Sequence, residues 1–144
     1  MTTPKGHAVL LDGAHNAAGA LALRSSIETL FENQPRAIIL GILRDKDCEQ
    51  ICHILAPLFD QIFLCPVESE RTAPPDVLLK FCSAANPSAQ LHCCDSLPEA
   101  LGMISGFTVL TGSLYFVGQA LEIFHAVAPS GERGLNEWQA ARPV

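Results

Sequence analysis

Asp12, His15 and Asn16 are the residues of this chain whose types and spacing best suit binding chemistry. They follow the apolar run of residues 8–11 and precede a helical pattern that begins at Ala17. An acid, an imidazole and an amide between a strand and a helix could bind a ribose hydroxyl, a phosphate or a carboxylate. Asp12 or Asn16 could equally cap the helix. Gly13 favours the binding role, because a glycine lets a ligand approach the backbone.

Two further segments carry polar groups at the ends of apolar runs. Residues 41–47 follow the run 37–40, and within them Lys46 or Arg44 could meet a phosphate, whereas Asp47 suits the cap of the next helix. Residues 111–113 follow the run 108–110, and Ser113 could cap its helix or bind a carboxylate there. We expect the three segments to meet at one edge of a sheet.

Short apolar runs alternate with helical patterns about five times along the chain. The expected strands are residues 8–11, 37–40, 62–65, 91–93 and 108–110. Several are continuous apolar runs, typical of strands covered on both faces. The alternation predicts an α/β fold, a Rossmann-like three-layer α/β/α unit around a mostly parallel sheet of about five to six strands.

The expected helices share an apolar stripe at helical spacing. Four of these stripes are Leu23, Ile27, Leu30 and Phe31; Cys48, Ile51, Cys52 and Leu55; Leu97, Leu101 and Ile104; and Leu114, Val117, Leu121 and Phe124. Pro57 follows the second stripe and interferes with a longer helix. A further helix is expected over residues 76–85, opened by Pro74 and Pro75. Ser96 and Glu99 have the spacing of a capping box at the start of the fourth helix.

The composition narrows the class of protein. The 144 residues favour one domain, and a net charge of −6 without basic clusters argues against nucleic-acid binding. No apolar run approaches a membrane span, and the polar N-terminus lacks a signal peptide, so we expect a cytoplasmic protein with its six cysteines reduced.

Cys48, Cys52 and His53 lack the usual spacing of zinc sites, so no metal site is expected. The sequence has no phosphate-binding loop, dinucleotide fingerprint or nucleophile elbow.

The segments 10–16, 41–47 and 111–115 together resemble the C-terminal domain of folylpolyglutamate synthase/dihydrofolate synthase, in the Mur ligase superfamily. The resemblance spans residues 8–127. It departs at Ala17, where the family usually has proline. It also departs at the start of the chain, which we expect to be part of a longer polypeptide.

The resemblance implies an enzyme that ligates glutamate to a folate or pteroate carboxylate through an acyl phosphate, using ATP and Mg²⁺. A separate N-terminal ATPase domain holds the phosphates, so none of these cofactors is expected on this chain alone. Asp12 would bind nucleotide, His15 would bind nucleotide and take part in catalysis, and Ser113 would bind substrate. Asn16 and Lys46 are possible residues of the cleft between the domains. The resemblance divides the chain into a ligase-type domain, 1–128, and a tail, 129–144.

Two other functions remain possible on the sequence. The chain could be a stand-alone nucleotide-binding or regulatory module of the same fold, which would bind ATP or AMP without another domain. A hydrolase using Ser113, His15 and Asp12 has only chance support, because no oxyanion signature accompanies these residues. The sequence does not decide whether the first glutamate, later ones or both are added.

Overall fold

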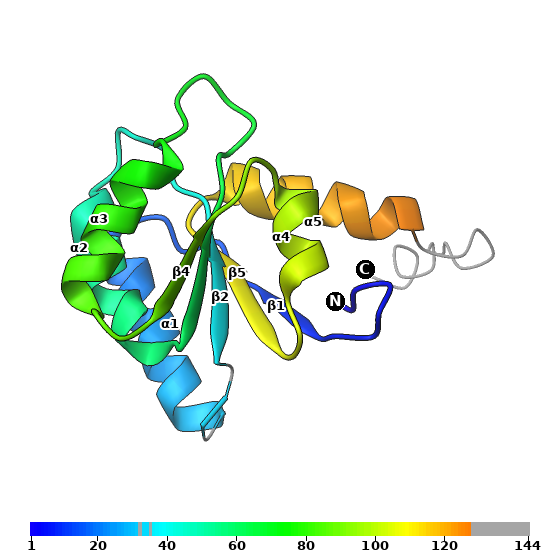
Figure 1. Ribbon diagram of the computed structural model, residues 1–144, viewed down its shortest axis with the longest axis horizontal. Helices are drawn as coiled ribbons and strands as arrows, with labels where there is room; N and C mark the ends of the chain where they lie inside the picture. Colours follow the sequence, from blue (N-terminus) through cyan, green and yellow to red (C-terminus); the bar gives the residue numbers. More distant parts are fainter. Residues whose placement is uncertain (32, 35, 128–144) are drawn as a thin grey trace.

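Five parallel strands form the centre of the protein, as the computed structural model of residues 1–127, apart from 32 and 35, shows (Figure 1). The strands are β1 (Val9–Leu11), β2 (Ala37–Leu40), β3 (Gln61–Leu64), β4 (Gln90–Cys93) and β5 (Thr108–Thr111). Their order across the sheet is β1-β5-β2-β3-β4. Each expected strand is confirmed to within one residue at either end. The continuous apolar runs mark these strands because both faces of the sheet are covered.

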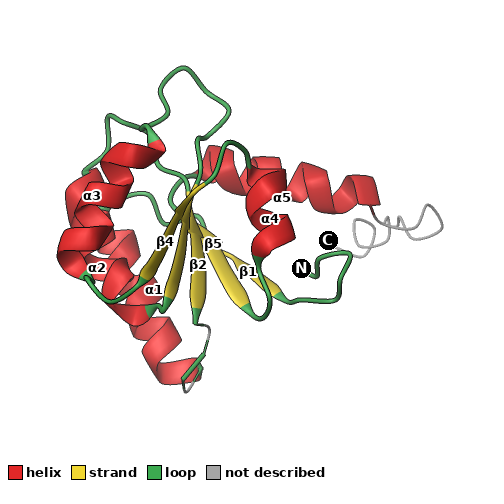
Figure 2. Cartoon of the chain, in the orientation of Figure 1, coloured by secondary structure: helices red, strands yellow, loops and turns green. Residues whose placement is uncertain are grey.

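Helices cover both faces of the sheet and make three layers (Figure 2). They are α1 (Ala17–Leu30), α2 (Cys48–Leu55), α3 (Pro75–Ala85), α4 (Leu97–Met103) and α5 (Leu114–Val127), with a short 3₁₀ helix, η1 (Ala56–Leu58). Helices α1, α2 and α3 share one core with Ile38 and Ile62, while α4 and α5 share the other with Ile39 and Phe63. The predicted three-layer α/β/α class is therefore confirmed.

Helix ends follow the signals in the sequence. Pro74 and Pro75 open α3, and Pro57 falls in η1, where α2 has ended. The Ser96 hydroxyl accepts from the Glu99 amide at 3.3 Å, as in a capping box. The Glu99 carboxylate accepts from the amide of Asp95, one residue before the cap, at 2.7 Å. The capping box is thus confirmed, except that the Glu99 carboxylate binds the amide of Asp95 and not that of Ser96.

Two predicted helix faces are wrong in part. Leu30 is 71% exposed, because the core covers α1 only as far as Ile27, and the end of α1 reaches past the amino ends of the strands (Figure 1). Leu114 is 64% exposed, whereas Phe116 is buried in its place. Helix α5 carries apolar residues on more than one face, so periodicity alone did not select the buried one.

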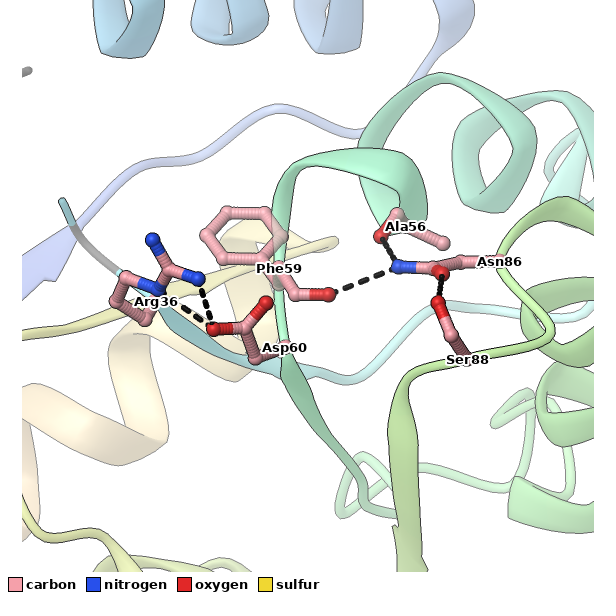
Figure 3. A network of polar contacts seen from close by, with 6 residues as sticks. All are labelled: Arg36, Ala56, Phe59, Asp60, Asn86 and Ser88. Carbon is pink, nitrogen blue, oxygen red and sulfur yellow. Dashed lines mark hydrogen bonds and ion pairs between the residues drawn. The ribbon is translucent and has the colours of Figure 1, made fainter. Parts of the chain in front are cut away.

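A polar network joins the amino ends of the strands at the edge opposite the three segments (Figure 3). The Asn86 amide nitrogen donates to the carbonyls of Ala56 and Phe59, at 2.9 and 2.8 Å, and so attaches the end of α3 to η1. Next to it, Arg36 and Asp60 form an ion pair. None of the expected site residues lies at this edge, which is opposite the carboxyl ends of the strands.

Candidate functional site at the carboxyl edge of the sheet

The sheet order brings the three predicted segments together. Strand β5 lies between β1 and β2, so residues 12–16, 41–47 and 111–113 leave three neighbouring strands at the same edge. The helices after β1 and β2 pack on one face, and α5 packs on the other. When the chain passes from neighbouring strands to helices on opposite faces of the sheet, a crevice forms at the ends of those strands. Ligands of α/β proteins bind in such crevices.

Glycines allow the three segments to touch. Gly112 has a φ of +119°, and a Cβ there would lie 2.4 Å from the Gly41 carbonyl oxygen. A Cβ on Gly41 would lie 2.8 Å from the Phe116 ring, and one on Gly13 would lie 2.5 Å from Leu114. The contact at Gly13 is with a terminal methyl of Leu114, which is 64% exposed and can move, so packing alone does not require glycine there.

The 12–16 segment folds into a local turn before α1. Asp12 Oδ1 accepts from the Ala14 amide at 2.8 Å, while Asn16 Oδ1 accepts from the Gly19 amide at 2.7 Å. Asn16 is thus the helix cap, and Asp12 instead closes the turn. His15 Nδ1 lies 2.8 Å from the Gly13 carbonyl oxygen. Because a carbonyl only accepts, Nδ1 carries the proton and Nε2 is the nitrogen left for a ligand.

An open pocket of about 390 Å³ lies beside this turn. It is lined by all of residues 12–16 and by Gly19, Ala22, Leu23 and Ser26 of α1. Asp12, His15 and Asn16 therefore share one pocket, while Lys46 and Ser113 lie outside it.

Ser113 is buried at the start of α5, only 3% exposed. Its hydroxyl accepts from the Tyr115 amide at 3.1 Å, and its carbonyl accepts from the Val117 amide at 3.0 Å. The capping role is thus confirmed. Among the described residues no acceptor lies within hydrogen-bonding distance of the hydroxyl hydrogen, which is left to donate.

Two of the four charged residues of the 41–47 segment have partners in residues 65–74. The Arg44 guanidinium donates to the Glu70 carbonyl, and Asp45 pairs with Arg71 at 2.5 Å. The hydrogen bond from Arg71 holds the pKa of Asp45 below its usual value. Asp47 caps α2 as predicted, accepting from Gln50 at 3.2 Å. Arg44 is therefore engaged, and the half-buried Lys46 is the cation of this segment left to reach a ligand.

Sequence reasoning missed the part that residues 65–74 play. They are fastened to the 41–47 segment by an antiparallel bridge between Leu43 and Thr72, and by the Ala73 amide, which donates to Ile42 at 2.8 Å. The opposite charges of Asp45 and Arg71 were the available signal.

The cysteines pack as expected. Cys48 and Cys52 are buried on one face of α2 while His53 is exposed, and Cys94 is buried beside the exposed Cys93. Within the described residues no three His, Cys, Asp or Glu side chains cluster as metal ligands, and no helix is long and apolar enough to cross a membrane.

Comparison with known proteins decides the family. Residues 1–112 match the family described as Mur ligase, glutamate ligase domain. The chain belongs to this family. It is 37% identical over 112 residues to a folylpolyglutamate synthase of Lacticaseibacillus casei, covering 74% of this chain and 24% of the relative. It is 23% identical over 131 residues to a dihydrofolate synthetase of Saccharomyces cerevisiae, covering 82% and 31%.

Solved structures agree with this assignment to the Mur ligase glutamate ligase domain. A folylpolyglutamate synthase of Thermotoga maritima has a TM-score of 0.76 and 29% identity over 88% of this chain and 30% of its own. One of Mycobacterium tuberculosis, solved with ADP and AMPPCP, has a TM-score of 0.71 and 26% identity over 81% and 29%. The chain thus spans about a quarter to a third of the length of these relatives. The expected resemblance is confirmed.

Proposed function

We propose that this chain is the C-terminal domain of an ATP-dependent folylpolyglutamate/dihydrofolate synthase. The enzyme would ligate glutamate to a folate or pteroate carboxylate through an acyl phosphate. The observation that carries the proposal is the meeting of the 12–16, 41–47 and 111–113 segments on neighbouring strands, in a domain of this family. The domain would close over a cleft whose other wall is an N-terminal ATPase domain.

The residues of the pocket fit one end of a nucleotide. Asp12 keeps one carboxylate oxygen beyond the turn, which suits a ribose hydroxyl, and His15 presents Nε2. Because Nδ1 holds the ring's proton in the neutral form, His15 can donate to a phosphate from Nε2 only as an imidazolium. ATP would supply the phosphoryl group of the acyl phosphate. The sequence has no phosphate-binding loop, so the other domain would hold the phosphates and Mg²⁺.

The other candidate residues take supporting roles in this proposal. Lys46 would face the cleft as a free cation, and Asn16 would hold the start of α1 beside the nucleotide. Ser113 would donate its hydroxyl hydrogen toward the amino-acid substrate after closure. The domain acts by positioning and charge stabilisation, so we expect no turnover from the chain alone.

Glutamate-dependent ADP release tests the proposal. The 144-residue chain and the longer polypeptide that contains it are assayed with a folate substrate, ATP and Mg²⁺. We expect release from the longer polypeptide alone. Turnover by the isolated chain would contradict the need for a second domain, and inactivity of both would contradict the ligase function.

The alternative is a stand-alone nucleotide-binding module, favoured by the fact that Asp12, His15 and Asn16 share one pocket. Calorimetric titration of the chain with ATP and AMP distinguishes the two. Tight binding that Asp12→Ala abolishes would favour the module, whereas the ligase proposal predicts weak or no binding. Asp12→Asn is the matched control, because it keeps an acceptor for the Ala14 amide.

A further inference from the structure

The carbonyl of Ala14 is held by two donors from the end of β5. The Gly112 amide donates to it at 3.1 Å, and the Thr111 hydroxyl makes a longer and weaker contact with it, at 3.5 Å. Thr111 is fully buried. A buried hydroxyl costs stability unless it is hydrogen-bonded, so its contact with Ala14 is the reason for a threonine here.

The Ala14 peptide is the centre of the turn that presents the pocket residues. Its amide donates to Asp12 Oδ1, and its carbonyl accepts from β5. The preceding carbonyl, of Gly13, accepts from His15 Nδ1. A displacement of the Ala14 peptide would therefore move both the Asp12 carboxylate and the His15 ring.

The donors on β5 are themselves fixed. The Thr111 carbonyl accepts from the Gly41 amide at 3.2 Å, and Gly112 adopts a φ of +119° against the Gly41 carbonyl. The turn after β1 is therefore connected to the end of β2 through β5, the strand that lies between them (Figure 1).

We propose that Thr111 is a positioning residue, which holds the turn of residues 12–16 so that Asp12 and His15 present a fixed geometry to a ligand. The part of this inference that concerns a nucleotide rests on the proposed function. The part that concerns the His15 ring does not.

Thr108 offers a matched control on the same strand. It is equally buried, and its hydroxyl donates to the Gly106 carbonyl at 2.9 Å, at the far end of β5. Thr111→Val and Thr108→Val therefore delete the same group from the same strand, one beside the pocket and one away from it. Thr111→Ser restores the hydroxyl.

The test is long-range ¹H–¹⁵N NMR of the histidine rings of the whole chain at about pH 8. His15→Gln assigns the His15 signals. In the parent chain we expect His15 as the Nδ1-protonated tautomer. Thr111→Val should shift it toward a tautomer mixture, while Thr108→Val and Thr111→Ser leave it unchanged. An unchanged His15 ring in Thr111→Val, or an equal change in Thr108→Val, would overturn the proposal.

Titration of the same variants with ADP separates this inference from the proposed function. Where ADP binds, Thr111→Val should weaken it by about two- to threefold, the effect of one weak hydrogen bond, and Thr108→Val should not. Absence of ADP binding in the parent chain would count against the stand-alone module, and the ring spectra would still decide the role of Thr111. A tautomer change in Thr111→Val with unaltered ADP affinity would overturn the link to the nucleotide.

Discussion

Asn16 illustrates how a single site residue can carry both stability and function. Its side chain accepts from the Gly19 amide at 2.7 Å and also borders the pocket. Asn16→Ala should lower the free energy of unfolding by about 1 kcal/mol, because the first turn of α1 loses its acceptor. Urea unfolding followed by circular dichroism measures the loss.

Asn16→Asp is the control for that substitution. Aspartate keeps the acceptor and adds a negative charge that the helix N-terminus favours, so its stability should equal or exceed that of the parent chain. Equal stability of Asn16→Ala and the parent would show that the cap contributes nothing in solution.

The sequence alone could not divide the roles of Asp12 and Asn16, since both residue types cap helices. The choice depends on backbone angles: Asn16 is extended, with φ −150° and ψ 176°, as an N-cap must be. The Thr111 contact with Ala14 was equally hidden, because it joins residues 97 positions apart. Ser113 could be predicted as a cap, but its burial could not.

Helix α5 packs closely against the residue that follows β2. A Cβ on Gly41 would lie 2.8 Å from ring atoms of Phe116, which is fully buried. Gly41→Ala should therefore cost about 1–3 kcal/mol of stability, since the buried ring has to move. Differential scanning calorimetry would show the lower melting temperature.

Gly118, within α5, supplies the opposite case. A Cβ there meets nothing within 4 Å, and alanine is the better helix former by up to about 1 kcal/mol. Gly118→Ala should raise the melting temperature. If the two alanine variants melted together, the close packing of α5 against β2 would not exist in solution.

At the scale of elements, the strands were predictable because burial on both faces leaves a continuous apolar run. Helix faces were less so. Leu23 and Ile27 of α1 are buried as expected, but Leu30 lies beyond the core. The sequence of a helix does not show how far the helix extends past the sheet that it packs on. The exposed Leu114 shows the same limit for α5, whose buried face depends on its docking at β5.

Across the whole molecule, the two cores differ in what they join. One packs α1, α2 and α3 against the sheet, and the other packs α4 and α5, with β5 contributing Val109 to the first and Leu110 to the second. The pocket is lined by the 12–16 turn and by α1, which packs in the first core. Because β5 contributes to both cores, both must be intact for the three segments to stay in register.

Thiol labelling tests whether the two cores open together. Five cysteines are buried and Cys93 is exposed, so one thiol should react in the native chain and six after unfolding. Burial and, to a smaller extent, the charge of Asp76 raise the pKa of Cys93, so its labelling should be slower than that of a free thiol and accelerate as pH rises.

The remaining thiols report on the cores separately, with Cys52 and Cys82 in one and Cys65 and Cys94 in the other. Hydrogen bonding to Cys82 and burial raise the pKa of Cys52, and burial raises that of Cys65, so neither should react without opening. In a Cys93→Ser variant, mass spectrometry of peptides from Cys82 and Cys65 should give equal labelling rates that follow global unfolding. Faster labelling of one core would show that the sheet's two faces open independently, and faster labelling of Cys82 would show that the face beside the pocket opens before global unfolding.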